Sequence, residues 1–273
     1  MSKDQRQQVA ALFDRAAVTY DDVGVELFQP IARRLVAELD PLPGERALDI
    51  GCGRGAALFP LARAVGPDAT VVGIDLALSM VSTTAADASR LGLTCDVRLG
   101  DAQHPDLDPA SFDVIASSLV LFFLPDPGAA LEAWRALLVD GGRVGISTFG
   151  DHSASWKAVD AVFTPFLPPQ MADPRTQGEA SPFATDAGVE QLLSHAGFGD
   201  VRTTTMTLPV RFDDEDHWYR WTWSTGQRRM WESIPAEQHA ATRAAAYEQL
   251  DRCRDGDGRI GFDQDVRFTL GRR

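Results

Sequence analysis

The strongest chemical signal in the chain is a set of three alternating glycines directly after a short apolar strand. The segment reads Ala47-Leu-Asp-Ile-Gly-Cys-Gly-Arg-Gly55, so Gly51, Gly53 and Gly55 form a turn at the end of that strand. Glycine has no Cβ, takes positive φ easily and lets a ligand approach the backbone closely. The amide N–H groups that open the next helix favour an anionic group. The turn therefore predicts a site for a ligand that carries a carboxylate or a phosphate.

Acidic residues lie at the ends of three successive expected strands. Asp49 precedes the first glycine by two residues, Asp75 ends the run Val71-Val-Gly-Ile-Asp75, and Asp101 lies in Leu99-Gly-Asp-Ala-Gln103. An acid in the position of Asp75 accepts hydrogen bonds from ribose hydroxyls in nucleotide-binding folds. Asp49 suits a cationic amino group, and Asp101 with its neighbours suits an adenine edge. Each acid could instead cap a helix or support a turn.

The glycines alone leave two cofactor classes open. A dinucleotide fingerprint of the form G-x-G-x-x-G/A fits Gly51, Gly53 and Ala56, and Asp75 would serve that class as well. A NAD-dependent oxidoreductase is therefore an alternative. The oxidoreductase alternative assigns no role to Asp49 or Asp101, and the chain has no Tyr-x-x-x-Lys pair of the short-chain dehydrogenase type.

The order and spacing of these motifs resemble the class I S-adenosylmethionine-dependent methyltransferases over about residues 8–150. Residues 111–126 and 139–147 are similar to the fourth and fifth strands of that family, and Phe-Phe-Leu-Pro-Asp-Pro at 122–127 is similar to its quinone and natural-product branch. The resemblance implies S-adenosylmethionine as cofactor and S-adenosylhomocysteine as product. It also implies that Leu76 and Met80 flank the adenine, that Tyr20 covers the methionine end, and that Ser117 and Ser118 line the passage to the acceptor. The implied cofactor-binding residues are Tyr20, Asp49, Gly51, Cys52, Gly53, Gly55, Asp75, Leu76, Met80, Gly100, Asp101, Ala102, Gln103, Ser117 and Ser118.

The elements that must position these residues alternate in type along the chain. Short β-branched runs and helical patterns follow one another between residues 46 and 147, which is typical of an α/β fold with a parallel sheet. We expect a Rossmann-like doubly wound sheet of seven strands, mostly parallel, and the resemblance implies that its last strand is antiparallel. The expected division is N-terminal helices at 1–40, the core at 41–150, a first cap insertion at 151–184, a core helix and strand at 185–211, a second helical cap insertion at 212–257 and the last strand at 258–273.

Methyl transfer from a sulfonium needs alignment and desolvation, and a base only for some acceptors. His152 and His217, one in each insertion, are the candidate bases, although a structural role suits either. Aromatic residues could enclose an apolar acceptor or simply pack the cap onto the core. The candidates for acceptor contact are Phe122, Phe123, Trp156, Trp218 and Trp221.

Composition limits the class of acceptor. Lys and Arg total 26 against 39 Asp and Glu, and a net charge of −13 argues against nucleic-acid binding. Three scattered cysteines indicate neither disulfides nor zinc, and no apolar stretch suits a membrane span, so we expect a cytoplasmic monomer or homodimer without a metal. The sequence predicts methyl transfer to a small, largely apolar metabolite, aromatic or prenyl-like, in natural-product biosynthesis. A cyclase that holds the cofactor without consuming it is the other alternative.

Overall fold

A computed structural model describes residues 3–150, 153–167 and 181–273 of the 273-residue chain. Its centre is a seven-stranded sheet in the order β3-β2-β1-β4-β5-β7-β6, in which β7 alone runs antiparallel to its neighbours. The strands are β1 (Ala47–Ile50), β2 (Val71–Asp75), β3 (Asp96–Leu99), β4 (Phe112–Ser118), β5 (Leu138–Phe149), β6 (Gly199–Phe212) and β7 (Ile260–Arg272). The predicted α/β class, the strand number and the antiparallel last strand are confirmed.

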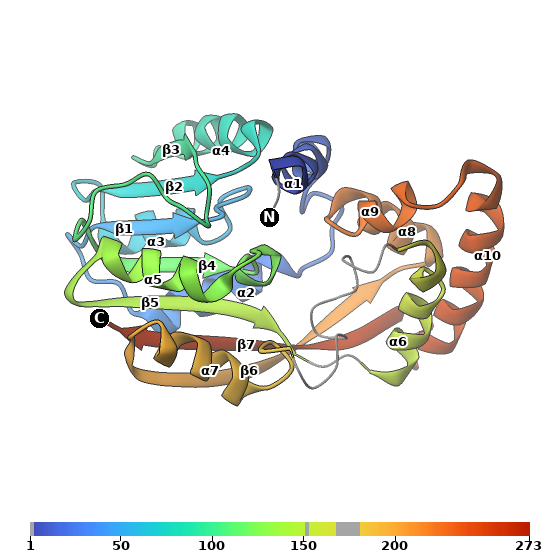
Figure 1. Cartoon of the computed structure of the whole chain (residues 1–273). Helices are drawn as coiled ribbons and strands as arrows, with labels where there is room; N and C mark the ends of the chain where they lie inside the picture. Colours follow the sequence, from blue (N-terminus) through green and yellow to red (C-terminus); the bar gives the residue numbers. More distant parts are fainter. Residues whose placement is uncertain (1–2, 151–152, 168–180) are drawn as a thin grey trace.

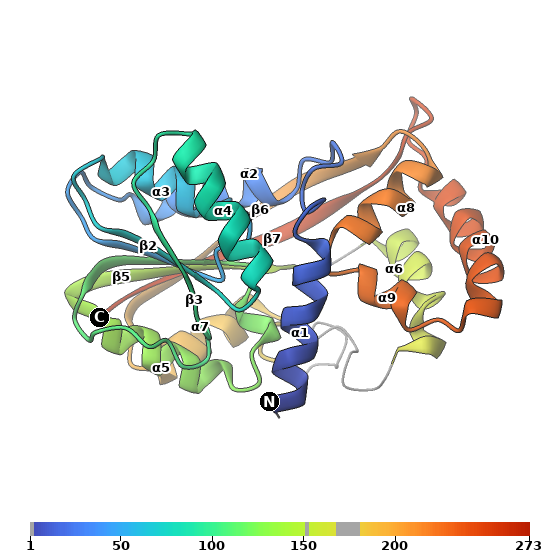
Figure 2. The same cartoon turned by 90° about the horizontal axis from the view of Figure 1, so that it is seen from above.

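Helices cover both faces of the sheet (Figures 1 and 2). One face carries α2 (Phe28–Leu39), α3 (Leu58–Val65) and α4 (Leu78–Arg90), and the other carries α5 (Pro127–Leu137) and α7 (Asp186–His195). The central strand β1 is buried along its whole length, with Ala47 in one apolar core and Leu48 and Ile50 in the other. A parallel strand covered on both faces is apolar throughout, which is why Asp49 stands out in it.

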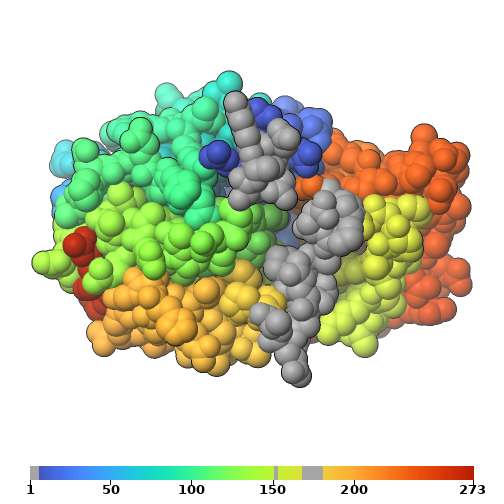
Figure 3. Space-filling view, viewed as in Figure 1, coloured from blue at the N-terminus to red at the C-terminus, as the bar shows by residue number. Residues whose placement is uncertain are grey.

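A helical cap lies beyond one end of the sheet, where β6 and β7 continue as a long two-stranded arm (Figure 1). The cap contains α6 (Ala154–Ala161), α8 (Glu215–Ser224), α9 (Arg228–Glu232) and α10 (His239–Leu250). Figure 3 shows its segments, coloured yellow-green and orange, gathered at one side of the molecule. A helix before the core, α1 (Lys3–Ala16), lies between α4 and the cap (Figure 2).

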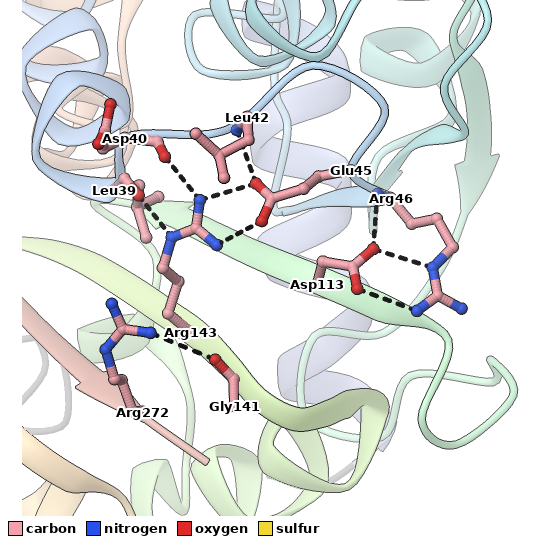
Figure 4. A network of polar contacts seen from close by, with 9 residues as sticks. All are labelled: Leu39, Asp40, Leu42, Glu45, Arg46, Asp113, Gly141, Arg143 and Arg272. Carbon is pink, nitrogen blue, oxygen red and sulfur yellow. Dashed lines mark hydrogen bonds and ion pairs between the residues drawn. The ribbon is translucent and has the colours of Figure 1, made fainter.

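A network of ion pairs fixes the opposite end of the strands (Figure 4). Arg143 of β5 donates to the carbonyl of Leu39 at 2.6 Å and to both carboxylate oxygens of Glu45 at 2.8 and 2.7 Å. Arg46, just before β1, makes a bidentate pair with Asp113 of β4. Since active sites of such sheets lie at the carboxyl ends of the strands, this network serves stability. Across the described residues, no helix has the length and apolar character that crossing a membrane requires.

Candidate active site

The glycine turn forms an open backbone cradle where β1 ends. Gly51, Gly53 and Gly55 all have positive φ, at 74°, 48° and 81°. The amides of Gly51 and Cys52 donate to the carbonyl of Ile74, which fixes the turn against β2. A Cβ at Gly53 would meet no atom within 4 Å, whereas one at Gly51 would collide with Val120 at 2.4 Å. The backbone at Gly53 is therefore exposed to an approaching ligand.

Asp75 joins the end of β2 to this turn. One carboxylate oxygen accepts from the Gly53 amide at 2.8 Å, and the other accepts from the Ala77 amide at 2.9 Å. Burial raises the pKa of Asp75, although these amides act in the opposite direction. Each carboxylate oxygen has a second lone pair, so Asp75 can support the turn and still accept a ribose hydroxyl.

Asp49 is the one buried carboxyl of the pocket that lacks support. Its residue is 1% exposed, and neither carboxyl oxygen has a hydrogen-bond partner of normal geometry in the described structure. Burial and the nearby Asp75 raise its pKa to about 8, and the Leu58 amide opposes this only weakly. A buried carboxylate without a partner is costly, so the site lacks a cationic or donating group. The α-ammonium group of S-adenosylmethionine would meet that need.

The end of β3 supplies the third acid. The Gly100 amide donates to the carbonyl of Asp75 at 2.9 Å, which brings the two strand ends together. Asp101 accepts from the Gln103 amide at 2.9 Å and pairs with Arg6 of α1 at 2.8 Å. The side-chain amide of Gln103 bonds twice to the backbone of Asp126, so it positions the loop before α5.

Two predicted adenine neighbours and a backbone carbonyl complete this end. Met80 is buried against Ala17 and Ala77, and Leu76 is half-buried beside Asp75. The carbonyl of Ala102 accepts from the Trp134 indole at 2.7 Å. The structure therefore brings the predicted ribose and adenine residues to one edge of the sheet.

A pocket lies at the other end of the glycine turn. Tyr20 lines it, with its ring stacked on that of Phe28 at a centroid distance of 5.0 Å. Burial and the neighbouring carboxylates of Asp21 and Asp75 raise the pKa of Tyr20 well above its usual value. The pocket is lined by Tyr20, Asp21, Phe28, Gln29, Asp49, Gly51, Cys52, Gly53, Arg54, Ala56, Ala57 and Ser118.

The two serines that end β4 differ in their surroundings. Ser118 lines the pocket and its hydroxyl bonds to that of Ser147 at 3.0 Å. Ser117 is fully buried and donates to the carbonyl of Ile50 at 2.9 Å, which holds β4 against β1. The Ser117 side chain thus has a structural bond of its own.

Sequence reasoning overlooked Asp21, Phe28, Gln29 and Arg54 as pocket residues. Their only sequence signal is that Asp21 follows Tyr20 directly and that Arg54 lies inside the glycine turn. Phe28 and Gln29 begin α2, which no motif connects to the turn. Their place in the pocket depends on how the segment before α2 folds over the sheet.

Of the two candidate histidines, only His217 can be placed relative to the pocket. His152 lies outside the described residues. His217 is 7% exposed, its Nε2 lies 2.7 Å from the carbonyl of Val23, and its Nδ1 accepts from the Asp213 amide at 3.2 Å. With both ring nitrogens engaged by backbone groups, His217 has a structural role at the start of α8 and no nitrogen available to a substrate.

The candidate aromatic residues form two groups. Trp156, Trp218 and Trp221 are buried inside the cap, where Trp156 stacks on Phe262 at 3.9 Å. Their indole N–H groups have no partner in the described structure. Phe122 and Phe123 instead lie in the short 3-10 helix η1 (Leu121–Phe123) that follows the carboxyl end of β4.

Phe123 is the more accessible of this second pair. Its residue is 45% exposed, and its ring lies 5.8 Å from that of Phe13 on α1. These positions favour Phe123 for contact with an acceptor and favour the tryptophans for building the cap. No group of three metal-binding side chains occurs among the residues that the structure describes.

Comparison with known proteins gives consistent results. Residues 47–142 match a family model described as a methyltransferase domain. The chain is 39% identical over 272 residues to nocamycin O-methyltransferase from Saccharothrix syringae, which covers 96% of this chain and 97% of that protein. It is 38% identical over 169 residues to aklanonic acid methyltransferase DauC from Streptomyces sp. strain C5, covering 62% and 77% of the two chains. The crystal structure of the YcgJ protein from Bacillus subtilis shares the fold, with a TM-score of 0.59, 16% identity, and coverage of 89% and 97%.

Proposed function

Since the chain belongs to the class I S-adenosylmethionine-dependent methyltransferases, we propose that it methylates an oxygen atom of a small natural product. The observation that supports the cofactor's placement is the buried Asp49 carboxyl group beside the glycine turn, whose oxygens have no hydrogen-bond partner of normal geometry among the described residues. Asp75 and Asp101 lie at or just after the ends of β2 and β3. The choice of oxygen is supported by the nocamycin O-methyltransferase, which aligns with this chain over nearly its whole length. The names of both relatives, which refer to nocamycin and to aklanonic acid, support a natural-product acceptor.

The site residues suit the cofactor by charge and by shape. Asp49 would hold the ammonium group, Asp75 the ribose hydroxyls, and the Gly51–Gly55 backbone the methionine end. The bound cofactor supplies an electrophilic methyl group on a good leaving group. The protein then aligns the acceptor with the methyl group and excludes water from the site. Tyr20 and the buried strand ends suit these two roles.

We propose the acceptor side at Phe122 and Phe123, under the cap. Phe122 lies 4.7 Å from Phe123 and 5.8 Å from Phe149, so the rings form an apolar wall between β4, β5 and α1. An aromatic or otherwise apolar acceptor would gain both burial and ring contacts there. Trp156, Trp218 and Trp221 would support this wall from inside the cap.

Binding and label transfer test the proposal in two steps. Calorimetric titration with S-adenosylmethionine, S-adenosylhomocysteine and NAD, repeated on Asp75→Ala, should show binding of the first two and its loss in the variant. Asp68→Ala changes an exposed acid between α3 and β2 and serves as the control. Binding of NAD alone would overturn the assignment of the site residues to S-adenosylmethionine.

Transfer of an isotope-labelled methyl group to a panel of phenols, enols and carboxylic acids then identifies the acceptor atom. Product in which the label sits on oxygen supports the proposal. Label on nitrogen or carbon would refute O-methylation. A product formed by cyclisation without label would favour the cyclase alternative.

A further inference from the structure

Asp21 occupies an unusual backbone position at the outer wall of the pocket. Its φ is 58°, in the left-handed region, and it directly follows Tyr20. A residue with a Cβ in this region costs about 1 kcal/mol, which aspartate tolerates better than most. The residue is half-buried and lines the same pocket as Asp49, Gly51 and Ser118. The turn thus places Asp21 in the wall of the pocket that Tyr20, Asp49 and Ser118 also line.

The other ionisable residues that line this pocket are unsuited to take a proton from an acceptor. Burial raises the pKa of Tyr20 and of Cys52 far from neutrality. Arg54 is a cation that already bonds to the Ala17 carbonyl at 2.6 Å and to Asp87 at 2.7 Å. Asp49 is enclosed at the strand end, where an acceptor would have to displace the cofactor.

Among the described residues, the other polar or candidate site residues do not replace Asp21. His217 uses both ring nitrogens, and Phe122 and Phe123 carry no acidic or basic group. The Ser118 hydroxyl shares a hydrogen bond with Ser147. Asp21 therefore combines access to the pocket with a carboxylate that has capacity to accept a proton.

We propose that Asp21 is the general base that deprotonates the acceptor hydroxyl, an inference that rests on the proposed O-methylation. In this step the proton passes from the acceptor oxygen to a carboxylate oxygen of Asp21. The deprotonated acceptor oxygen forms a bond to the methyl carbon while the carbon–sulfur bond breaks, and the electron pair of that bond stays on the sulfur of S-adenosylhomocysteine. Asp21 then returns the proton to water, since its side chain is partly exposed.

The charges around Asp21 fit such a role. Burial raises the pKa of its carboxyl group to about 6, and Asp22 adds to this. The Gln29 side chain, Arg54 in the glycine turn and Arg33 on α2 act in the opposite direction. Tyr20 and Asp49 also face the pocket. A base of this strength is ionised at neutral pH and matches an acidic hydroxyl, such as a phenol or an enol, better than an aliphatic alcohol.

The test compares Asp21→Asn with Asp22→Asn, a change to the exposed neighbour. Naphthol, a cyclic diketone in its enol form and para-nitrophenol serve as acceptor probes, and S-adenosylhomocysteine serves as the binding probe. For neutral naphthol or the enol, we expect kcat of Asp21→Asn to fall about 100-fold or more. Its affinity for S-adenosylhomocysteine should stay within about threefold of the wild type. The wild-type kcat should fall about tenfold per pH unit below about pH 6, and Asp21→Asn should lose this dependence.

Para-nitrophenol, already largely ionised at about pH 8, should be methylated by Asp21→Asn within about threefold of the wild-type rate. Asp22→Asn should match the wild-type kcat at neutral pH and keep the acid-side fall in kcat, displaced slightly to lower pH because Asp22 helps to raise the pKa of Asp21. Unchanged kcat in Asp21→Asn, or a loss of S-adenosylhomocysteine binding instead, would overturn the base assignment. If the wild type methylates no oxygen acceptor, the proposed function fails first and the base assignment fails with it.

Discussion

Asp49 is a buried carboxyl group whose missing partner should make cofactor binding depend on pH. With a pKa of about 8 in the free protein, the group is protonated in about nine molecules of ten at pH 7. An ammonium group needs the carboxylate form, so binding must expel the proton. Each pKa unit corresponds to about 1.4 kcal/mol, so affinity for S-adenosylhomocysteine should rise about tenfold between about pH 6 and 7 and level off above about pH 8.

The assay is calorimetric titration with S-adenosylhomocysteine in two buffers of different ionisation enthalpy. At pH 7 the wild type should release about 0.9 proton per ligand bound, and Asp49→Asn should release almost none. The variant should also lose about 1.5–3 kcal/mol of binding free energy at about pH 8, the value of a hydrogen bond to a charged group. Asp68→Asn is the control.

The same pKa predicts the sign of a stability effect in the free protein. The folded state keeps a proton on Asp49 that the unfolded chain, with a pKa near 3.8, releases. Unfolding is therefore favoured progressively as pH rises from about 4 to 8. Asp49→Asn should remove this slope in chemical denaturation. Wild-type protein without proton release on binding and without this slope would refute the reasoning.

Three further predictions concern the glycine turn, the cap and the ion-pair network. Gly53 and Gly92 both have positive φ, and an added Cβ would meet no atom within 4 Å at either position. Gly53→Ala and Gly92→Ala should therefore each lower the free energy of unfolding by about 1 kcal/mol in chemical denaturation. Only Gly53→Ala should weaken S-adenosylhomocysteine binding, by tenfold or more, because its methyl group would lie in the backbone cradle. Equal binding by both variants would place the ligand elsewhere. Trp231→Phe should cost about 1 kcal/mol more unfolding free energy than Trp218→Phe. The Trp231 indole donates to the Thr222 hydroxyl at 2.8 Å, whereas the Trp218 indole N–H has no partner among the residues that the structure describes. The reverse order would show that the Trp218 N–H is satisfied. Glu45→Gln should lose about 1 kcal/mol at pH 7, and the deficit should vanish in acid, because Arg143 lowers the pKa of Glu45 and its contribution disappears as pH falls through that value. A deficit that persists in acid would attribute the loss to packing.

The sheet, and the meeting of the candidate cofactor residues at one edge of it, could be predicted because each depends on residues close together in sequence. The glycine turn follows β1 immediately, and Asp75 and Asp101 lie at or just after the ends of β2 and β3. In a parallel sheet, strand ends meet at one edge, so the spacing alone brings these groups together. Sequence spacing does not determine where a side chain points. The hydrogen bonds of Gln103 to Asp126 and of Ser117 to Ile50 could therefore not be predicted.

The acceptor side is harder to predict because its parts come from distant segments. The left-handed backbone of Asp21 leaves no trace in composition or periodicity, and His217 looks reactive until Val23 is placed beside its ring. Tryptophans at helical spacing suit a ligand pocket and a packed cap equally well, and only ring contacts such as Trp156 on Phe262 distinguish the two.

The helix α1 connects these two sides physically. Arg6 pairs with Asp101 at the expected adenine end, Phe13 contacts Phe123 at the expected acceptor wall, and Arg15 makes a bidentate pair with Glu232 on α9 of the cap. Asp14 accepts from the Ser79 amide at 2.7 Å, which fixes the helix to the start of α4. The helix α1 thus contacts the end of β3, the proposed acceptor wall and the cap. A displacement of one of these three regions must either move α1, and with it the other two, or break the contact that Arg6, Phe13 or Arg15 makes. If the acceptor lies at the proposed wall, we therefore expect acceptor specificity to depend on the N-terminal helix as well as on the tryptophan-rich cap.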